Sequence, residues 1–300
     1  MIRHLNKNDH PPRRLIVLGG SGFIGKAIAT ESLKAGINVI SLGRDDIDLV
    51  HPDSGTRLAK MLDEGDAIMM SSARAPAKTF EMMLENLTML KPLIYAIGSA
   101  HPSHIVYVSS DAVYSDSPDP LSEFSETNPA TVHGIMHKTR ETILQNEVSI
   151  RFGVPFVVIR PTLIYGKDDP HNGYGPNKFF RLVQTGKNIS IFGKGEELRD
   201  HVSIHDVAQL TVKLLLRRSE GVLNIATGDT SSFRDIAKQI IALSKLPLNI
   251  DEIPRAGPMP HNGYRAFDTF LTKLAFPEFS YKSLETGLIE MSKEMKDRPL

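Results

Sequence analysis

A glycine-rich loop between an apolar run and an amphipathic segment constrains the fold of this chain most strongly. Residues 14–18 read Arg-Leu-Ile-Val-Leu, and residues 26–33 place apolar side chains at helical spacing. Glycines between them permit a tight turn and close approach of the backbone to a phosphate, and a helix start offers free N–H groups to an anion. The loop therefore predicts a dinucleotide-binding unit. The residues expected to contact the dinucleotide are Gly19, Ser21, Gly22, Phe23, Ile24 and Gly25.

Strand-like and helix-like segments alternate beyond this loop. Strands are expected at 37–42, 46–50, 67–70, 105–109 and 154–160, and helices at 56–63, 80–96 and 131–148. Such alternation means right-handed crossovers and a parallel sheet covered on both faces. The predicted fold is α/β, with a Rossmann-type doubly wound parallel sheet and a smaller C-terminal substrate-binding lobe.

The local composition along the chain also predicts its domains. Residues 1–13 are polar and contain two prolines, and are expected to form a flexible extension. Residues 14–166 are expected to form the dinucleotide-binding domain, whose sheet a strand near 221–226 joins. Residues 167–300 are expected to form mainly the substrate-binding lobe, because the chain turns rich in Gly, Pro, Asn and His after residue 165.

Composition excludes several classes of function. The 35 basic residues balance 35 acidic ones, so no overall field favours nucleic acid or a membrane surface. The chain has no cysteine, which excludes disulfides, thiolate catalysis and cysteine-bound zinc. No apolar run reaches the length of a membrane span. We expect a cytoplasmic protein with no metal, nucleic-acid partner or membrane partner.

Landmarks along residues 14–230 follow one another in the order of a known family. They include the glycine loop, the segment 108–114, in which Ser110 is similar to the family's catalytic Ser or Thr, and the segment 160–166 before the lobe. Together they resemble the extended short-chain dehydrogenase/reductases, which comprise nucleotide-sugar epimerases, dehydratases and reductases. The resemblance implies bound NAD(P) and hydride transfer at a sugar carbon, with epimerisation and keto-sugar reduction both open. It also implies that Asn86 supports the cofactor end of the active site.

The end of the second strand predicts the type of cofactor. Dinucleotide folds place an acidic residue there to bind the ribose of NAD, whereas an arginine accommodates the 2′-phosphate of NADP. The expected acid is absent and Arg44 takes the neighbouring place. We therefore expect NADP, with NAD as the alternative. By resemblance, Asp48 contacts the adenine.

The family resemblance breaks down at the catalytic helix. Family members carry a Tyr and a Lys four residues apart, and the matching positions here are His133 and His137. Three interpretations stay open. His133 could transfer the proton, since imidazole titrates near neutrality, with His137 binding the cofactor ribose. Asp111 beside Ser110 could do so instead. Alternatively, the site is degenerate, and the protein binds a nucleotide sugar or cofactor without turnover, as a sensor or partner subunit.

The substrate end is predicted by resemblance and by charge. Asn177 precedes an apolar helix start whose free N–H groups suit a diphosphate, and Arg199 is expected to bind that diphosphate in bidentate fashion. Family members often dimerise through a four-helix bundle, for which helices 80–96 and 131–148 are the candidates. The expected partners are a nucleotide-sugar substrate and a second copy of the chain.

Overall fold

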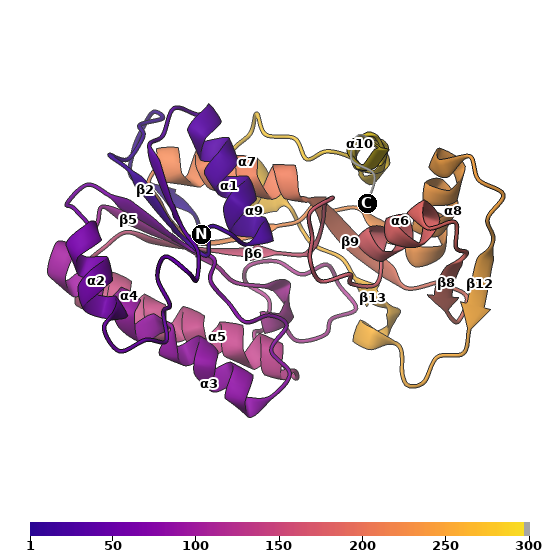
Figure 1. The fold of residues 1–300 in the computed structure, drawn as a ribbon, viewed down its shortest axis with the longest axis horizontal. Helices are drawn as coiled ribbons and strands as arrows, with labels where there is room; N and C mark the ends of the chain where they lie inside the picture. Colours follow the sequence, from indigo (N-terminus) through magenta and orange to yellow (C-terminus); the bar gives the residue numbers. More distant parts are fainter. Residues whose placement is uncertain (297–300) are drawn as a thin grey trace.

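The protein, represented by a computed structural model that describes residues 1–296, is built on a seven-stranded sheet (Figure 1). The strand order is β1-β10-β6-β5-β4-β2-β3, and every strand except β1 is parallel to its neighbours. The strands are β1 (Arg3–His4), β2 (Leu15–Leu18), β3 (Val39–Leu42), β4 (Ala67–Met70), β5 (His104–Val108), β6 (Phe156–Pro161) and β10 (Ser219–Ile225). The predicted Rossmann-type fold class is confirmed.

Helices cover both faces of the sheet (Figure 1). One face carries α1 (Phe23–Lys34), α7 (Ile204–Leu216) and α9 (Phe270–Ala275); the other carries α2 (Ser54–Met61), α4 (Leu90–Ala100) and α5 (Val132–Leu144), with α3 (Phe80–Thr88) beside α5. In β2, Leu15 and Val17 enter one core, whereas Ile16 and Leu18 enter the other. A strand buried on both faces needs such an unbroken apolar run. Within residues 1–296, no helix has the length and apolar character that crossing a membrane requires.

The start of the chain is attached to the sheet and is not a flexible extension. Arg3 and His4 pair antiparallel with Glu220 and Ser219 of β10. The two ring nitrogens of His4 lie 2.8 Å from the Ser219 hydroxyl and 3.0 Å from the carbonyl oxygen of Ala275. These long-range contacts cover an edge of the sheet, and a local polar composition does not reveal them.

Two predicted elements differ in the structure. Residues 46–50 form turns and no strand, because the Asp46 carboxylate accepts the N–H of Gly43 and the Asp48 carboxylate accepts that of Val50. The predicted helix 80–96 is two helices that meet at Met89. Proline lacks the N–H that would continue the ladder, and Pro92 lies in the first turn of α4, where proline is tolerated.

The C-terminal lobe has its own apolar core. Its strands are β7 (Leu163–Tyr165), β8 (Ile189–Phe192), β9 (Leu198–Ser203), β11 (Thr230–Ser232), β12 (Ile250–Ile253) and β13 (Tyr264–Arg265), and its helices are α6 (Pro176–Gln184), α8 (Phe233–Ser244) and α10 (Leu284–Lys296). Between these segments the chain returns to the large sheet, where β10 pairs with β6. A short 3-10 helix occupies Asp111–Val113, and a π-helix, Gln145–Arg151, continues α5. Pro260–Gly263 is a tight turn in which His261 and Asn262 have positive φ.

The topology places a ligand site where β2 and β4 end. The chain leaves β2 toward β3 on one side and returns to β4 on the other, so the loops after these two adjacent strands diverge. A crevice opens at such a switch point in doubly wound sheets. The C-terminal lobe lies beside this edge (Figure 1).

A buried ion pair attaches α5 to the sheet. Glu141 of α5 receives two hydrogen bonds from Arg160 of β6, at 2.9 and 2.6 Å, and a third from the hydroxyl of Ser109, at 2.6 Å. Arg160 also donates to the hydroxyl of Tyr114, which in turn donates to Asn224 of β10. Burial opposes the charge of Arg160, yet the Glu141 carboxylate raises the pKa of Arg160 above its ordinary value. The helix orientation therefore depends on this pair.

Replacing Glu141 by Gln is expected to lower the free energy of unfolding by about 3–5 kcal/mol, because the buried guanidinium loses its counter-charge. The control is Glu147→Gln, which removes the exposed pair with Arg151 one turn further along and should cost less than about 1 kcal/mol. Urea unfolding followed by circular dichroism measures both. Equal costs would show that the buried pair does not stabilise the fold.

Candidate active site

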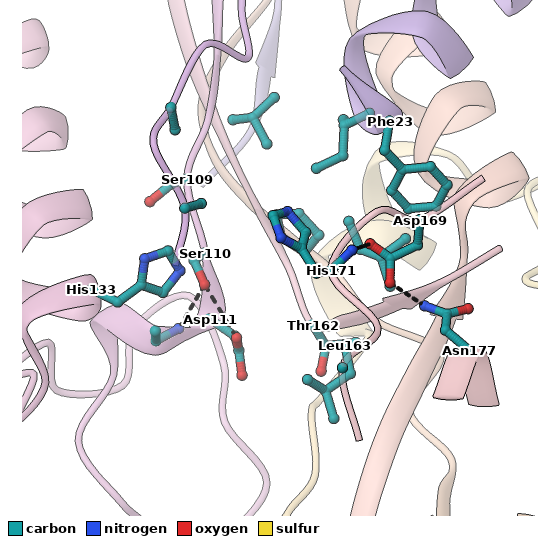
Figure 2. A pocket seen from close by; sticks show the side chains of 18 of the residues that line it. Phe23, Ser109, Ser110, Asp111, His133, Thr162, Leu163, Asp169, His171 and Asn177 are labelled. Atoms are coloured by element: carbon teal, nitrogen blue, oxygen red, sulfur yellow. Dashed lines mark hydrogen bonds between the residues drawn. The ribbon is translucent and has the colours of Figure 1, made fainter. Parts of the chain in front are cut away.

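A cavity of about 660 Å³ lies at the carboxyl ends of the strands, between the sheet and the lobe (Figure 2). Its lining from the Rossmann side includes Gly19, Gly22, Phe23, Ile24, Gly25, Ser110, Asp111, His133 and His137. Its lining from the lobe includes Asp169, His171, Asn177, Arg199, His201 and Arg265. The structure thus brings most of the predicted site residues to one cavity, although it separates Ser21, Arg44, Asp48 and Asn86 from it.

The glycine loop has the geometry of a phosphate site. Gly19 has a φ of +88°, and a Cβ on Gly25 would lie 2.2 Å from the carbonyl oxygen of Gly19, so α1 begins in direct contact with the turn. Gly22 is the N-cap and, among the described residues, no side chain caps the helix. The first N–H groups of α1 therefore face the cavity and can bind the anionic part of a dinucleotide. Ser21 lines a neighbouring hollow with Lys26.

Arg44 and Asp48 lie beyond the end of β3. Their side chains are 3.6 Å apart and exposed, Arg44 by 71%. Gly43 follows the strand, and a Cβ there would lie 2.9 Å from the hydroxyl of Ser21. Arg44 is therefore an exposed cation near the glycine loop and is not part of the cavity wall.

Asn86 supports the loop after β4. Its side chain accepts the N–H of Arg74 at 2.9 Å and donates to the carbonyl oxygens of Arg74 and Met82, at 3.1 and 2.8 Å. The amide is fully buried and does not line the cavity. Asn86 consequently shapes the wall without reaching a ligand.

Ser110 and Asp111 follow β5 and face the cavity (Figure 2). The Ser110 hydroxyl lies 3.4 Å from the Asp111 carboxylate and accepts the N–H of Ala112 at 3.1 Å. Arg265 of the lobe donates to the same carboxylate at 2.8 Å, and its side chain is only 3% exposed. This ion pair connects the end of β5 with the lobe.

The two histidines lie one turn apart on α5, with ring centroids 4.6 Å apart and planes almost perpendicular. Thr131 caps this helix by accepting the N–H of Gly134. The Nδ1 atom of His133 accepts the N–H of Ala77 at 3.4 Å, so a neutral His133 carries its proton on Nε2. Burial lowers the pKa of His133 below its ordinary value, while the Asp111 carboxylate opposes that change. Burial and the neighbouring His133 also lower the pKa of His137.

The opposite wall comes from the loop before α6 (Figure 2). Asn177 donates to Asp169 at 2.7 Å and accepts the N–H of Gly166 at 3.0 Å. Asp169 also accepts the N–H of His171, which carries its imidazole into the cavity. The Asn177 side chain therefore holds this loop in place, and His171 presents the polar group.

Arg199 already has a carboxylate partner. Its guanidinium donates to Glu197 at 2.9 Å and to the carbonyl oxygens of Pro260 and Leu198, at 2.6 and 2.9 Å. Glu197 also forms an ion pair with Arg255, and its side chain is only 6% exposed. An anionic ligand would have to take over part of this hydrogen bonding.

Several important residues escaped sequence reasoning. Tyr107 bonds to His137, the Arg140 guanidinium lies over the Tyr107 ring, and Glu197 pairs with Arg199. Tyr107 lies in an apolar strand and resembles an ordinary core residue. The sequence offered one sign of Arg140. It lies three residues after His137, which places a charged side chain on the same face of α5 as the histidine.

The fold and this cavity define a class of protein: a Rossmann-type dinucleotide-binding protein with a ligand lobe over the switch point. Residues 15–226 match the NAD dependent epimerase/dehydratase family. The chain belongs to that family, which confirms the resemblance seen in the sequence.

Curated relatives in this family are enzymes. The UDP-N-acetyl-alpha-D-glucosaminuronate decarboxylase of Bacillus cytotoxicus is 23% identical over 83% of this chain and 86% of its own length. The dTDP-4-dehydro-6-deoxy-D-allose reductase of Streptomyces bikiniensis is 22% identical over 94% of this chain and 95% of its own. A GDP-L-fucose synthetase from Naegleria fowleri bound to NADP has the same fold, with a TM-score of 0.83, 18% identity, and coverage of 98% of this chain and 97% of that one.

Proposed function

We propose that this protein is an NADPH-dependent reductase of a keto group on a nucleotide-linked sugar. The observation that carries the proposal is the pair of imidazoles at the cavity wall, His133 and His137, whose Nδ1 atoms both make hydrogen bonds away from the cavity. Neutral imidazoles held in this way present N–H donors, which polarise a carbonyl oxygen. An epimerase would first need a base to take a hydroxyl proton, so this arrangement favours reduction.

The cofactor would bind along the glycine loop. The N–H groups at the start of α1 would hold its pyrophosphate, and Arg44 would reach the 2′-phosphate that distinguishes NADP from NAD. When bound, the nicotinamide supplies the hydride. Solved structures of the same fold hold NADP in one case and NAD in others, so the choice of NADP rests on Arg44.

The chain's own groups would bind and polarise the substrate. His133 and Ser110 would donate hydrogen bonds to the carbonyl oxygen, where negative charge develops as hydride arrives. A hydride and a proton from solvent are added in each turnover, so NADPH is consumed one for one. Asp111 pairs with Arg265 and is not the proton donor in this scheme. The Ser110 hydroxyl has one proton, which would leave its long 3.4 Å contact with Asp111 to reach the carbonyl oxygen.

Mixing the protein with NADPH and a nucleoside-diphosphate 4-keto sugar is expected to remove one reduced nicotinamide per alcohol formed, followed by nicotinamide absorbance. His133→Phe should lower kcat by about 10²- to 10³-fold, because an oxyanion donor is lost. His51→Phe changes an exposed histidine outside the cavity and is the matched control. Unchanged kcat in His133→Phe would contradict the role of His133. Binding of both ligands without turnover would favour the sensor or partner-subunit alternative.

Arg44→Ala is expected to weaken NADPH binding by about 10- to 100-fold, the worth of a charge-assisted hydrogen bond. NADH lacks the 2′-phosphate, so its affinity should stay the same and serves as the internal control. Fluorescence titration of the reduced nicotinamide measures both affinities. Equal weakening of NADH and NADPH would mean that Arg44 does not read the phosphate.

Glu197→Gln is expected to tighten the binding of a nucleoside diphosphate by about tenfold, because the ligand no longer competes with a carboxylate for Arg199 and Arg255. The adjacent, exposed Glu196→Gln is the control. Isothermal titration calorimetry with UDP or dTDP compares the variants. Weaker binding in Glu197→Gln would mean that Glu197 orders the arginines for the ligand instead of competing with it.

A further inference from the structure

A buried tyrosine lies directly behind the catalytic helix. The hydroxyl of Tyr107, on β5, is 2.7 Å from Nδ1 of His137 on α5. Tyr107 is 1% exposed and His137 is 5% exposed, so water does not compete for this hydrogen bond. Tyr107 lies in the sheet and His137 forms part of the cavity wall, which means that the bond connects the core with the ligand site.

The direction of this hydrogen bond follows from what else each group can reach. His137 is the one partner of the Tyr107 hydroxyl among the described residues. If Nδ1 of His137 were the donor, the phenolic proton would be buried without an acceptor, which costs about 1–3 kcal/mol. Burial also raises the pKa of Tyr107 and lowers that of His137, and both changes keep the proton on the phenol. Tyr107 is therefore the donor and Nδ1 is the acceptor.

Arg140 lies next to this pair and opposes protonation of His137. Its guanidinium is fully buried, donates to the carbonyl oxygen of Ser72 at 3.0 Å, and lies over the Tyr107 ring with its central carbon 5.1 Å from the ring centroid. No carboxylate pairs with it within residues 1–296. An uncompensated positive charge one turn from His137 opposes protonation of the imidazole, in addition to burial and the neighbouring His133.

We propose that Tyr107 is a positioning residue that fixes His137 as the Nε2–H tautomer, with this donor directed into the cavity. The phenol occupies Nδ1, and the remaining nitrogen has no partner among the described residues. The ring can neither change its tautomer nor gain a charge at Nδ1 without leaving the buried phenolic proton of Tyr107 without an acceptor. The group it binds must then be an oxygen with free lone pairs.

The identity of that oxygen rests on the proposed function. In a site that holds NADPH, a neutral donor beside His133 suits a hydroxyl of the nicotinamide ribose or the carbonyl oxygen of the substrate. A donor fixed by Tyr107 binds the oxygen without adding charge.

Nitrogen NMR of protein labelled with ¹⁵N in the histidine rings tests the tautomer directly and needs no ligand. His137 is assigned by the signals that disappear in His137→Gln. The wild-type protein is expected to show His137 as a neutral Nε2–H ring whose signals do not titrate between about pH 8 and pH 6. Tyr107→Phe keeps the ring packing but removes the donor, and should convert His137 to a mixture of tautomers. Tyr114→Phe removes another buried phenol that bonds elsewhere, and should leave the His137 signals unchanged.

A second measurement separates this inference from the proposed function. Tyr107→Phe should raise the dissociation constant of NADPH by about 3- to 10-fold, the worth of one neutral hydrogen bond. An Nδ1–H ring in the wild-type protein, ordinary titration of His137, or unchanged signals in Tyr107→Phe would overturn the positioning role, even with the reductase active. If NADPH binds to no variant while the wild-type tautomer is Nε2–H, the proposed function fails and the role of Tyr107 stands.

Discussion

The ion pair between Glu141 and Arg160 is the interaction on which the site geometry depends. α5 carries both cavity histidines, and this pair sets the rotation and height of the helix over β6. Ser109 joins the same carboxylate, so the strand end that presents Ser110 is placed relative to α5 by one acceptor. A buried pair of this kind contributes little net stability compared with an apolar replacement, but removing one partner is costly. Its value here lies in geometry, because two separate elements meet at one point.

Local pattern was enough to predict the fold, but not the contacts that tune the site. Apolar runs of strand length and the glycine loop predicted a parallel sheet with a cavity beyond its strand ends, and β2 and α1 have that form. Residues 46–50 have strand-like composition, yet their carboxylates bind backbone N–H groups and form turns. The attachment of the chain start to β10 depends on residues more than 200 positions away, which no local window contains.

The candidate site shows the same division. Residues with a family position, such as Ser110 and His133, reach the cavity wall where the resemblance placed them. The partners that decide their chemistry are set by packing: Tyr107 meets His137 because β5 lies beneath α5, and Arg265 reaches Asp111 across the two lobes. The amino-acid type alone does not reveal whether a charged side chain has a partner of opposite charge. The sequence suggests that Arg199 is a free cation, whereas the structure pairs it with Glu197.

Charge is compensated differently at the two ends of the cavity. At the lobe end, Arg199 shares Glu197 with Arg255, and Arg265 binds Asp111, so each buried guanidinium has a carboxylate within the protein. At the helix α5 end, burial lowers the pKa of both imidazoles, and one of the buried cations there, Arg140, has no carboxylate partner among the described residues. An anionic ligand must therefore exchange hydrogen bonds at the lobe end, which makes affinity there sensitive to the strength of an internal ion pair. A polar but uncharged group at the other end meets donors that need no such exchange. The arginines of the lobe would thus bind the charged part of the ligand, and the imidazoles of α5 would polarise its reacting oxygen. Substitutions can alter these two groups of residues separately.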